Sequence, residues 1–216
     1  MGSQIIAIAF ILAGYLVGSI SFGLIIGKAV KKIDIRHYGS GSTGATNVAR
    51  TCGPIYGAIV LLLDMAKAIV PLVFAMQIID TPIWSHSFIG LSAIVGHVWP
   101  LYTRFHGGKG IASGWAALTI LCPWAGLLAT LVGVPLIIIF RYVSLGSICG
   151  SIFGTISLVI FCFVSPLPLI DSVPYTYSIF GIFGGIITVA LHRQNILRLI
   201  DGKEKKIGQR SQDRSN

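Results

Sequence analysis

The chain has little charge and very few acidic residues. Charged side chains make up 11% of its 216 residues, and 7 Asp and Glu stand against 16 Lys and Arg. Acids dispersed along a chain cannot supply the carboxylate clusters that hold Mg²⁺ or Ca²⁺. The 5 histidines form no H-x-x-x-H pair and the 4 cysteines no C-x-x-C pair. We therefore expect no metal site, and we interpret the cysteines as isolated apolar thiols.

Nucleotide-binding motifs are also missing, although one glycine-rich segment resembles them. Gly39, Gly41 and Gly44 spell G-x-G-x-x-G, but a dinucleotide site needs a preceding strand within a βαβ unit. An apolar segment follows here instead. Ala45 and Thr46 stand where a P-loop requires Lys followed by Ser or Thr. The sequence thus excludes both nucleotide folds and predicts no cofactor.

Apolar sequence is abundant. Hydrophobic residues make up 54% of the chain and the mean hydropathy is +0.84, far from the globular range. A net charge of +9 could indicate nucleic acid, but the basic residues cluster between apolar runs, which is typical of membrane topology. We expect the bilayer, and no nucleic acid, as partner. Runs long enough to span it cover about 5–27, 55–79, 83–102, 145–164 and 175–191.

The apolar stretch at 111–140 could be one long helix or two. Arg104 and Lys109 precede it and Arg141 follows it, so both ends should be cytoplasmic and the number of crossings even. We therefore predict two short helices that turn near Pro123. The result is an all-α integral membrane protein of about seven transmembrane helices, with the N-terminus outside and the C-terminus cytoplasmic. Residues 1–216 form one domain with a short basic tail from about 193.

This topology sorts the charges. Every basic residue except Lys67 falls on the inner side, whereas the outer loops carry only Asp80 and Asp171. Lys67 and Asp64 lie within a predicted span, three residues apart, and can pair on one helical face. Ionisable groups at this depth are costly and tend to be functional. They could brace the inner loops or contact a substrate.

The first inner loop, residues 39–50, has the composition of a phosphate site. Glycines allow sharp turns that expose backbone N–H groups, hydroxyls and amides add donors without bulk, and arginine offers a planar fork for phosphate oxygens. A flexible linker is the alternative. The candidate residues are Ser40, Gly41, Ser42, Thr43, Gly44, Ala45, Thr46, Asn47 and Arg50.

Two further inner segments carry polar groups. Glycines around Lys109, including Gly108, predict a tight turn that presents one ammonium at a helix start, although a snorkelling interfacial lysine is the alternative. His192, Asn195 and Arg198 recur every three residues where the last helix leaves the bilayer and continues, a pattern that suits a phosphorylated or polyhydroxy ligand. Arg141 alone is typical of a topology anchor.

These residues resemble the motifs of the acyl-phosphate-dependent glycerol-3-phosphate acyltransferases, over essentially the whole chain. The resemblance rests on the 39–50 loop, the 107–112 turn, and the His192-x-x-Asn195-x-x-Arg198 helix end followed by Gly202-x-Glu204. Leu63-Asp64-Met-Ala-Lys67 and Arg141-Tyr-Val-Ser144 add to it. One departure is visible, because Ser42-Thr43 stands where the family usually has Asn and an apolar residue.

The resemblance implies an enzyme of the bacterial cytoplasmic (inner) membrane, with its active site at the cytoplasmic face. Such enzymes transfer a fatty acyl group from acyl phosphate to the 1-hydroxyl of glycerol 3-phosphate, giving lysophosphatidic acid and phosphate, the first acylation of phospholipid synthesis. It also implies catalytic roles for Lys109, Ser40 and His192. The 40–47 loop and Arg50 would hold the acyl phosphate. Glycerol 3-phosphate would bind at His192, Asn195, Ser144 and Arg141, with Arg198 and Glu204 completing the motif.

The proton acceptor is left open between His192 and a substrate phosphate. No histidine is followed by Asp five residues later, so the His-x-x-x-x-Asp mechanism of acyl-CoA-dependent acyltransferases is disfavoured. A transporter of a phosphorylated solute is the alternative function, because proline-interrupted membrane helices can mark transport sites. The lack of an evident inverted repeat and the concentration of motifs on one face argue against it. A purely structural scaffold would leave the glycine-rich loops unexplained.

Overall fold

The computed structural model describes residues 2–79, 81–166, 168 and 171–209. These residues form helices joined by turns, with no β-strand among the described ranges. The all-α class predicted from the sequence is confirmed. The α-helices are α1 (Gly2–Gly18), α2 (Phe22–Lys31), α3 (Ala45–Cys52), α4 (Pro54–Val73), α5 (Ile83–Val98), α6 (Ile111–Leu121), α7 (Pro123–Phe140), α8 (Val143–Val164), α9 (Tyr177–Ala190) and α10 (Arg193–Ile200).

Among the described residues, four helical segments are long and apolar enough to cross a bilayer, namely Gly2–Lys31, Pro54–Ile78, Pro123–Phe140 and Val143–Val164. Pro54–Ile78 consists of α4 and a turn of π-helix, Phe74–Ile78. The outward faces of these helices carry large apolar side chains: Ile138 is 69% exposed and Phe163 70% exposed. Apolar helix faces of this kind are typical of segments that contact lipid.

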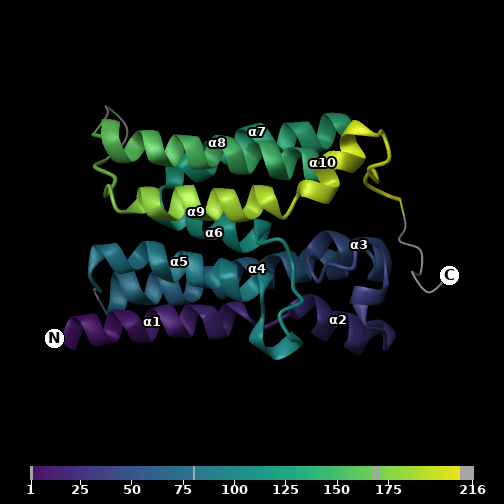
Figure 1. The fold of residues 1–216 in the computed structure, drawn as a ribbon, viewed down its shortest axis with the longest axis horizontal. Helices are drawn as coiled ribbons and strands as arrows, with labels where there is room; N and C mark the ends of the chain where they lie inside the picture. The colour runs from purple at the N-terminus through teal and green to yellow at the C-terminus, as the bar shows by residue number, and fades with distance from the viewer. Residues whose placement is uncertain (1, 80, 167, 169–170, 210–216) are drawn as a thin grey trace.

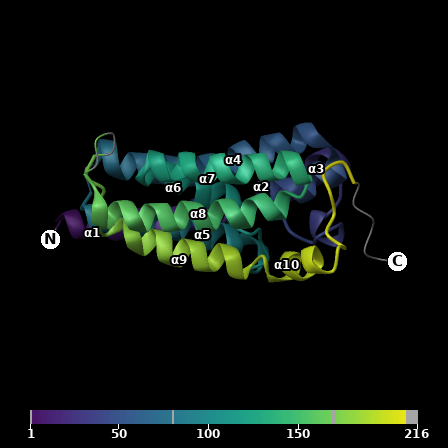
Figure 2. The same ribbon diagram turned by 90° about the horizontal axis from the view of Figure 1, so that it is seen from above.

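The long helices form two groups with α6 between them (Figure 1). Helices α1, α4 and α5 make one group and α7, α8 and α9 the other, and α6 contacts members of both. Figure 2 gives the same bundle from above. The main core lies where α4, α5, α6, α8 and α9 meet, around Leu72, Ile89, Leu118, Leu158 and Phe180. A second, smaller core under α2 and α3 includes Ile35 and Val48.

The stretch at 111–140 breaks at the predicted place. Only Cys122 separates α6 from α7, which begins at Pro123, where the missing proline N–H costs the helix nothing. The Trp115 Nε1 donates to Thr130 Oγ1 at 2.9 Å across the hairpin, so the two helices run antiparallel. One detail of the prediction is wrong: α6 is short at 11 residues, but α7 has 18.

Three other boundaries differ from the expected ones. The first apolar run is not one helix, because α1 ends at Gly18 and α2 begins at Phe22. The last helix does not continue past the bilayer, because α9 ends at Ala190 and α10 begins at Arg193. The 39–50 loop leads into α3 before the next long helix starts. Hydropathy cannot place such breaks, because it is averaged over a window of residues. The backbone groups that a break frees are satisfied by partners far away in the chain, which hydropathy does not detect.

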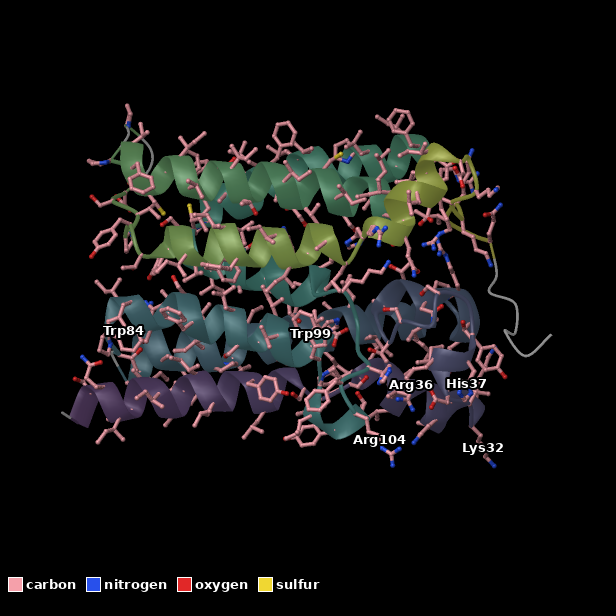
Figure 3. The ribbon with its side chains drawn as sticks, viewed as in Figure 1. Lys32, Arg36, His37, Trp84, Trp99 and Arg104 are labelled. Atoms are coloured by element: carbon pink, nitrogen blue, oxygen red, sulfur yellow. The ribbon has the colours of Figure 1, made fainter. Side chains whose placement is uncertain are left out.

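Basic residues gather at one end of the long axis. Figure 3 places Lys32, Arg36, His37 and Arg104 toward the end that holds α2, α3 and α10, and Trp84 at the opposite end. Asp171 is exposed, whereas Asp80 and the tail beyond 209 lie outside the described residues. The number of membrane crossings and the placement of the N-terminus outside stay predictions.

Candidate active site

The loop at 38–44 is shaped from within by the side chain of Asn47, which is 3% exposed. Its Oδ1 accepts from the Ser40 amide at 3.2 Å, and its Nδ2 lies within hydrogen-bond distance of the carbonyls of Ile35, Tyr38 and Ser42, at 2.9 to 3.1 Å. Two glycines complete the turn with positive φ, 56° at Gly39 and 73° at Gly41. Asn47 thus organises the loop.

The expectation that this loop exposes its backbone N–H groups is wrong. The amides from Ser40 to Gly44 each donate within the protein: those of Ser42 and Gly44 donate to Ser40 Oγ and Ser42 Oγ, and that of Thr43 to the Gly107 carbonyl at 3.4 Å. Ser40, Ser42 and Thr46, which carry hydroxyls, and the first turn of α3 instead line the neighbouring cavity. A helix start retains N–H groups without intrahelical acceptors, so an anion can still bind there.

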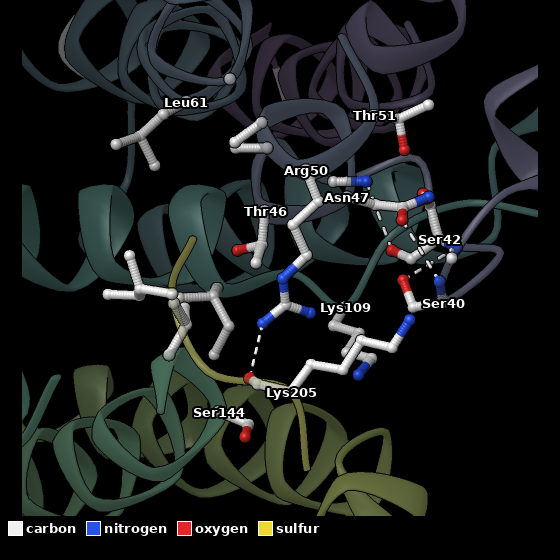
Figure 4. Close-up of a pocket in the computed structure, with 18 of the residues that line it drawn as sticks. Ser40, Ser42, Thr46, Asn47, Arg50, Thr51, Leu61, Lys109, Ser144 and Lys205 are labelled. Carbon is white, nitrogen blue, oxygen red and sulfur yellow. Dashed lines mark hydrogen bonds between the residues drawn. The ribbon is translucent and has the colours of Figure 1, made fainter. Parts of the chain in front are cut away.

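A cavity of about 1400 Å³ opens between this loop and α10 at the basic end of the bundle (Figure 4). Its walls come from α3 and α10, and its floor from α4, the start of α6, the end of α7 and the start of α8. Figure 4 shows Arg50 and Lys109 in this cavity, the first from α3 and the second from the turn before α6. Asp64 and Glu204 are the carboxylates that line the cavity, among the basic side chains Lys31, Arg50, Lys109, Arg198, Lys203 and Lys205.

The Glu204 carboxylate joins three elements within the cavity. Its Oε1 accepts from Ser144 Oγ at 2.8 Å and Asn195 Nδ2 at 2.7 Å, and its Oε2 from Arg198 Nε at 2.7 Å. Burial is the largest influence on the pKa of Glu204 and raises it, but these donors together hold the pKa below its usual value of 4.5. Glu204 is therefore ionised and fixes α10 against α8.

Lys109 lies on the opposite side of Asn195, whose Oδ1 accepts from the Lys109 ammonium. Asn195 is thus held at both ends, between Lys109 and Glu204. Burial, with the positive charges of Arg198 and Arg50 acting in the same direction and Glu204 opposing them, lowers the pKa of Lys109 to about 8. The site holds more positive charge than its own carboxylates neutralise, which favours an anionic ligand.

His192 is 3% exposed and forms the N-cap position of α10. Its Nδ1 lies 2.7 Å from the Thr188 carbonyl oxygen, so Nδ1 carries the proton. Nε2 then has a free lone pair and can accept a hydrogen bond. Burial lowers the pKa of His192 to about 4, and the nearby Lys109 charge acts in the same direction. The imidazole is therefore neutral at physiological pH and a weak proton acceptor.

Most of the predicted site residues meet at this cavity. Ser40, Ser42, Gly44, Ala45, Thr46, Asn47, Arg50, Lys109, Ser144, His192, Asn195, Arg198 and Glu204 line it. Gly41, Thr43 and Gly108 are not among the lining residues, although each is next to one of them in the chain. Arg141 is exposed and its Nη2 donates to the Ile207 carbonyl at 3.2 Å, so it holds the C-terminal segment.

Sequence reasoning missed several contributors to the cavity. The Lys205 carbonyl accepts from Arg50 Nη2 at 2.8 Å (Figure 4), which orients the guanidinium, and Lys31 and His97 belong to the lining. A backbone carbonyl has no sequence signal. A histidine can complete the buried Asp64–Lys67 pair, but the 33 positions that separate His97 from Asp64 along the chain hide this pairing.

An apolar pocket of about 300 Å³ adjoins the polar cavity. The two share Leu61, Ile111, Ala112, Ile137 and Ser147. The apolar pocket runs among α6, α7, α8 and α9, where its lining includes Leu118, Phe180 and several glycines. The polar end of an amphiphile can therefore lie among the basic side chains while its hydrocarbon end stays in apolar surroundings.

The fold and the site together define a helical membrane protein with a basic cavity, adjoined by an apolar pocket, at one end of its bundle. The model of the glycerol-3-phosphate acyltransferase family matches residues 8–202. A glycerol-3-phosphate acyltransferase of Desulforamulus reducens is 43% identical, covering 96% of this chain and 98% of its own. The corresponding enzyme of Halalkalibacterium halodurans is 39% identical over 94% and 96% of the two chains.

Solved structures agree with these matches. The crystal structure of PlsY (YgiH), an integral membrane glycerol 3-phosphate acyltransferase, in its glycerol 3-phosphate form has a TM-score of 0.84 and 34% identity, covering 94% of this chain and 96% of its own. Its lysophosphatidic acid form has a TM-score of 0.81 and 33% identity over the same shares. The chain belongs to the glycerol-3-phosphate acyltransferase family. It is an integral membrane acyltransferase, as its motifs predicted.

Proposed function

We propose that this protein transfers a fatty acyl group from acyl phosphate to the 1-hydroxyl of glycerol 3-phosphate, at the cytoplasmic face of the bacterial inner membrane. The products would be lysophosphatidic acid and inorganic phosphate. The observation that carries this proposal is the cavity itself, in which uncompensated basic side chains adjoin an apolar pocket. A donor with a phosphate at one end and a hydrocarbon chain at the other matches both halves.

The donor chemistry explains why the site needs no enzyme nucleophile. An acyl phosphate is a mixed anhydride with a good leaving group, so the protein has chiefly to orient two phosphorylated substrates and stabilise charge at the carbonyl. Arg50 and the hydroxyls of Ser40 and Thr46 are placed to bind the leaving phosphate. Lys109 lies between these groups and the third motif, the segment from His192 to Glu204. There its ammonium can stabilise the oxyanion as the substrate hydroxyl attacks.

The contacts of the third motif favour indirect roles for two predicted ligands of glycerol 3-phosphate. The Asn195 amide bonds to Lys109 at one end and to Glu204 at the other, and the Ser144 hydroxyl donates to Glu204. We therefore propose that Asn195 and Ser144 orient Lys109 and Glu204. The weak basicity of His192 favours a substrate phosphate oxygen as acceptor of the hydroxyl proton. His192 Nε2 then serves as a hydrogen-bond acceptor for a glycerol hydroxyl.

The decisive experiment compares donors with purified protein in detergent. We expect lysophosphatidic acid from glycerol 3-phosphate and acyl phosphate, with negligible product from acyl-CoA. Transport would vanish without compartments, so turnover in detergent also separates the enzyme from the transporter alternative. Chelator should leave the rate intact, because the mechanism uses ammonium and guanidinium groups. Equal use of acyl-CoA, or loss of activity restored by one divalent ion, would refute the proposed mechanism.

The rate should depend on pH through Lys109. The kcat/KM for acyl phosphate reports groups of the free enzyme, and the ammonium loses its proton as pH rises through about 8. We expect kcat/KM to decline above that pH. In Lys109→Arg the remaining rate should persist to higher pH, because arginine stays charged. Initial rates at subsaturating donor measure the profile, with acyl phosphate hydrolysis without enzyme as control. If kcat/KM of Lys109→Arg declined at the same pH, the titrating group would be one other than Lys109.

The proposed orientation can be tested by labelling single cysteines in intact cells. Cysteines introduced at Gly202 and Arg104 should react only with reagents that enter the cytoplasm, because they lie at the basic end. A cysteine at Asp171 should react with impermeant reagent from outside. If the cysteines introduced at positions 104 and 202 were labelled from opposite faces of the membrane, the predicted topology would be contradicted. A variant that lacks the natural Cys52, Cys122, Cys149 and Cys162, all free thiols, is the background.

A further inference from the structure

We propose that three buried ionisable residues, Asp64, Lys67 and His97, form a network that positions Lys109 for acyl transfer. This inference rests on the proposed role of Lys109. None of the three is exposed by more than 6%. The Lys67 Nζ lies 2.9 Å from Asp64 Oδ1, and His97 Nδ1 lies 3.5 Å from the same oxygen. We call these residues the buried ion network.

One end of the network holds the break in the first membrane helix. The Lys67 Nζ donates to the Ile20 carbonyl at 3.0 Å, between α1 and α2, and lies 5.9 Å from the centre of the Phe22 ring. A carbonyl freed by such a break needs a donor where water is absent. The backbone of Asp64 is tied in turn to α6, because Ser113 Oγ donates to its carbonyl at 2.7 Å.

The other end forms the base of the glycine turn at 107–110. The Gly108 amide donates to the His97 carbonyl at 3.0 Å. A Cβ atom on Gly108 would lie 2.0 Å from His97 Nε2, and one on Gly107 would lie 2.2 Å from the His97 carbonyl oxygen. Both glycines are thus required by their contact with His97. On its far side the imidazole faces Asp64 Oδ1 at 3.5 Å, so the ring lies between this carboxylate and the glycine turn and defines how closely the turn approaches α5.

Lys109 follows Gly108 directly, and its ammonium meets Asn195 across the cavity. The Gly107 carbonyl accepts from the Thr43 amide at 3.4 Å, which connects the turn to the first loop as well. A shift of the His97 ring therefore moves the Lys109 ammonium and changes its distance from the 39–50 loop and from α10. Asp64 and His97 act as positioning residues, and Lys67 neutralises the carboxylate that orients the imidazole.

The test is a double-mutant cycle between His97 and Lys109 in purified enzyme. His97→Asn keeps an N–H donor for Asp64 and removes the ring edge against Gly108. We expect a loss of kcat of about 10- to 100-fold with little change in either KM, because a misplacement of 1 Å can cost ~10² in rate. In the Lys109→Ala background the same substitution should change the residual turnover by less than about 2-fold, because the group it positions is gone.

His86→Asn is the matched control. His86 lies in the same helix and is equally buried at 6% exposure, but it contacts Tyr177 and Thr81 away from the cavity. The His86→Asn substitution should lower thermal stability and leave the kcat of the folded enzyme within about 2-fold of the wild-type value. If His97→Asn does not fold, Gly108→Ala displaces the ring without removing it and enters the same cycle.

Equal fractional losses in both backgrounds, or an unchanged kcat in folded His97→Asn, would overturn the inference. A different result would overturn the proposed role of Lys109 instead, namely near-normal turnover of Lys109→Ala alone. Because the cycle contains both single variants, the two failures are distinguished in one set of measurements.

Discussion

Replacing Lys109 with alanine should lower turnover by on the order of 10²- to 10³-fold, the usual cost of removing a donor aimed at developing charge. The ammonium contacts Asn195, and in the proposed mechanism it lies between the two segments that would bind phosphate. Insertion and folding should be preserved, because Lys109 belongs to a glycine turn and contributes little packing. Lys109→Arg should rescue the rate only in part, since a planar fork cannot replace a compact charge in the same turn. Initial rates at saturating substrates give the comparison.

Lys28→Ala is the control for the loss of one positive charge at the same end of the bundle. Lys28 lies in the last turn of α2, is exposed, and is not among the residues that line the cavity. Its removal should leave turnover within about 2-fold, because exposed charges contribute little. A correctly inserted Lys109→Ala protein with near-normal turnover would reduce Lys109 to an interfacial anchor. The anion site would then rest on Arg50 and Arg198.

Replacing Glu204 should destabilise the enzyme and also shift its pH profile. Glu204→Ala leaves the buried donors of Ser144 and Asn195 without an acceptor. We expect a loss of about 2–4 kcal/mol in the free energy of unfolding, to which the Arg198 pair adds little because that side chain is 37% exposed. Thermal unfolding in detergent measures it. Asp201→Asn, at an exposed pair with Lys203 separated by 3.8 Å, should change stability by less than about 0.5 kcal/mol.

Glu204→Gln separates charge from shape. The Glu204 carboxylate raises the pKa of Lys109, so its neutralisation should move the alkaline decline of kcat/KM to lower pH. The folded pKa of Glu204 lies below its usual 4.5, so its contribution to stability is complete above that value and is lost as pH falls through the folded pKa. The stability difference between wild type and Glu204→Gln should therefore narrow in acid. A difference that stays constant across that range would contradict the assignment.

The sequence alone determined the class of the protein and the segments that form its candidate site. Long apolar runs require a membrane, basic clusters mark one side of it, and Pro123 ends one helix and starts the next because it has no N–H to donate. Local composition also identified the three polar segments. Their residues, from Ser40 to Glu204, largely meet at one cavity. Such features depend on short windows of sequence, which is why they could be predicted.

Only the tertiary structure decided how the polar groups are used. The Asn47 amide faces its own loop, Arg141 holds the C-terminal segment, and Glu204 accepts from residues of two helices. The break after Gly18 and the contact of His97 with Gly108 likewise depend on partners far away in the chain. A side chain's role is set by the donor or charge that it meets across the fold, and burial makes that partner obligatory. Residue type alone does not name the partner.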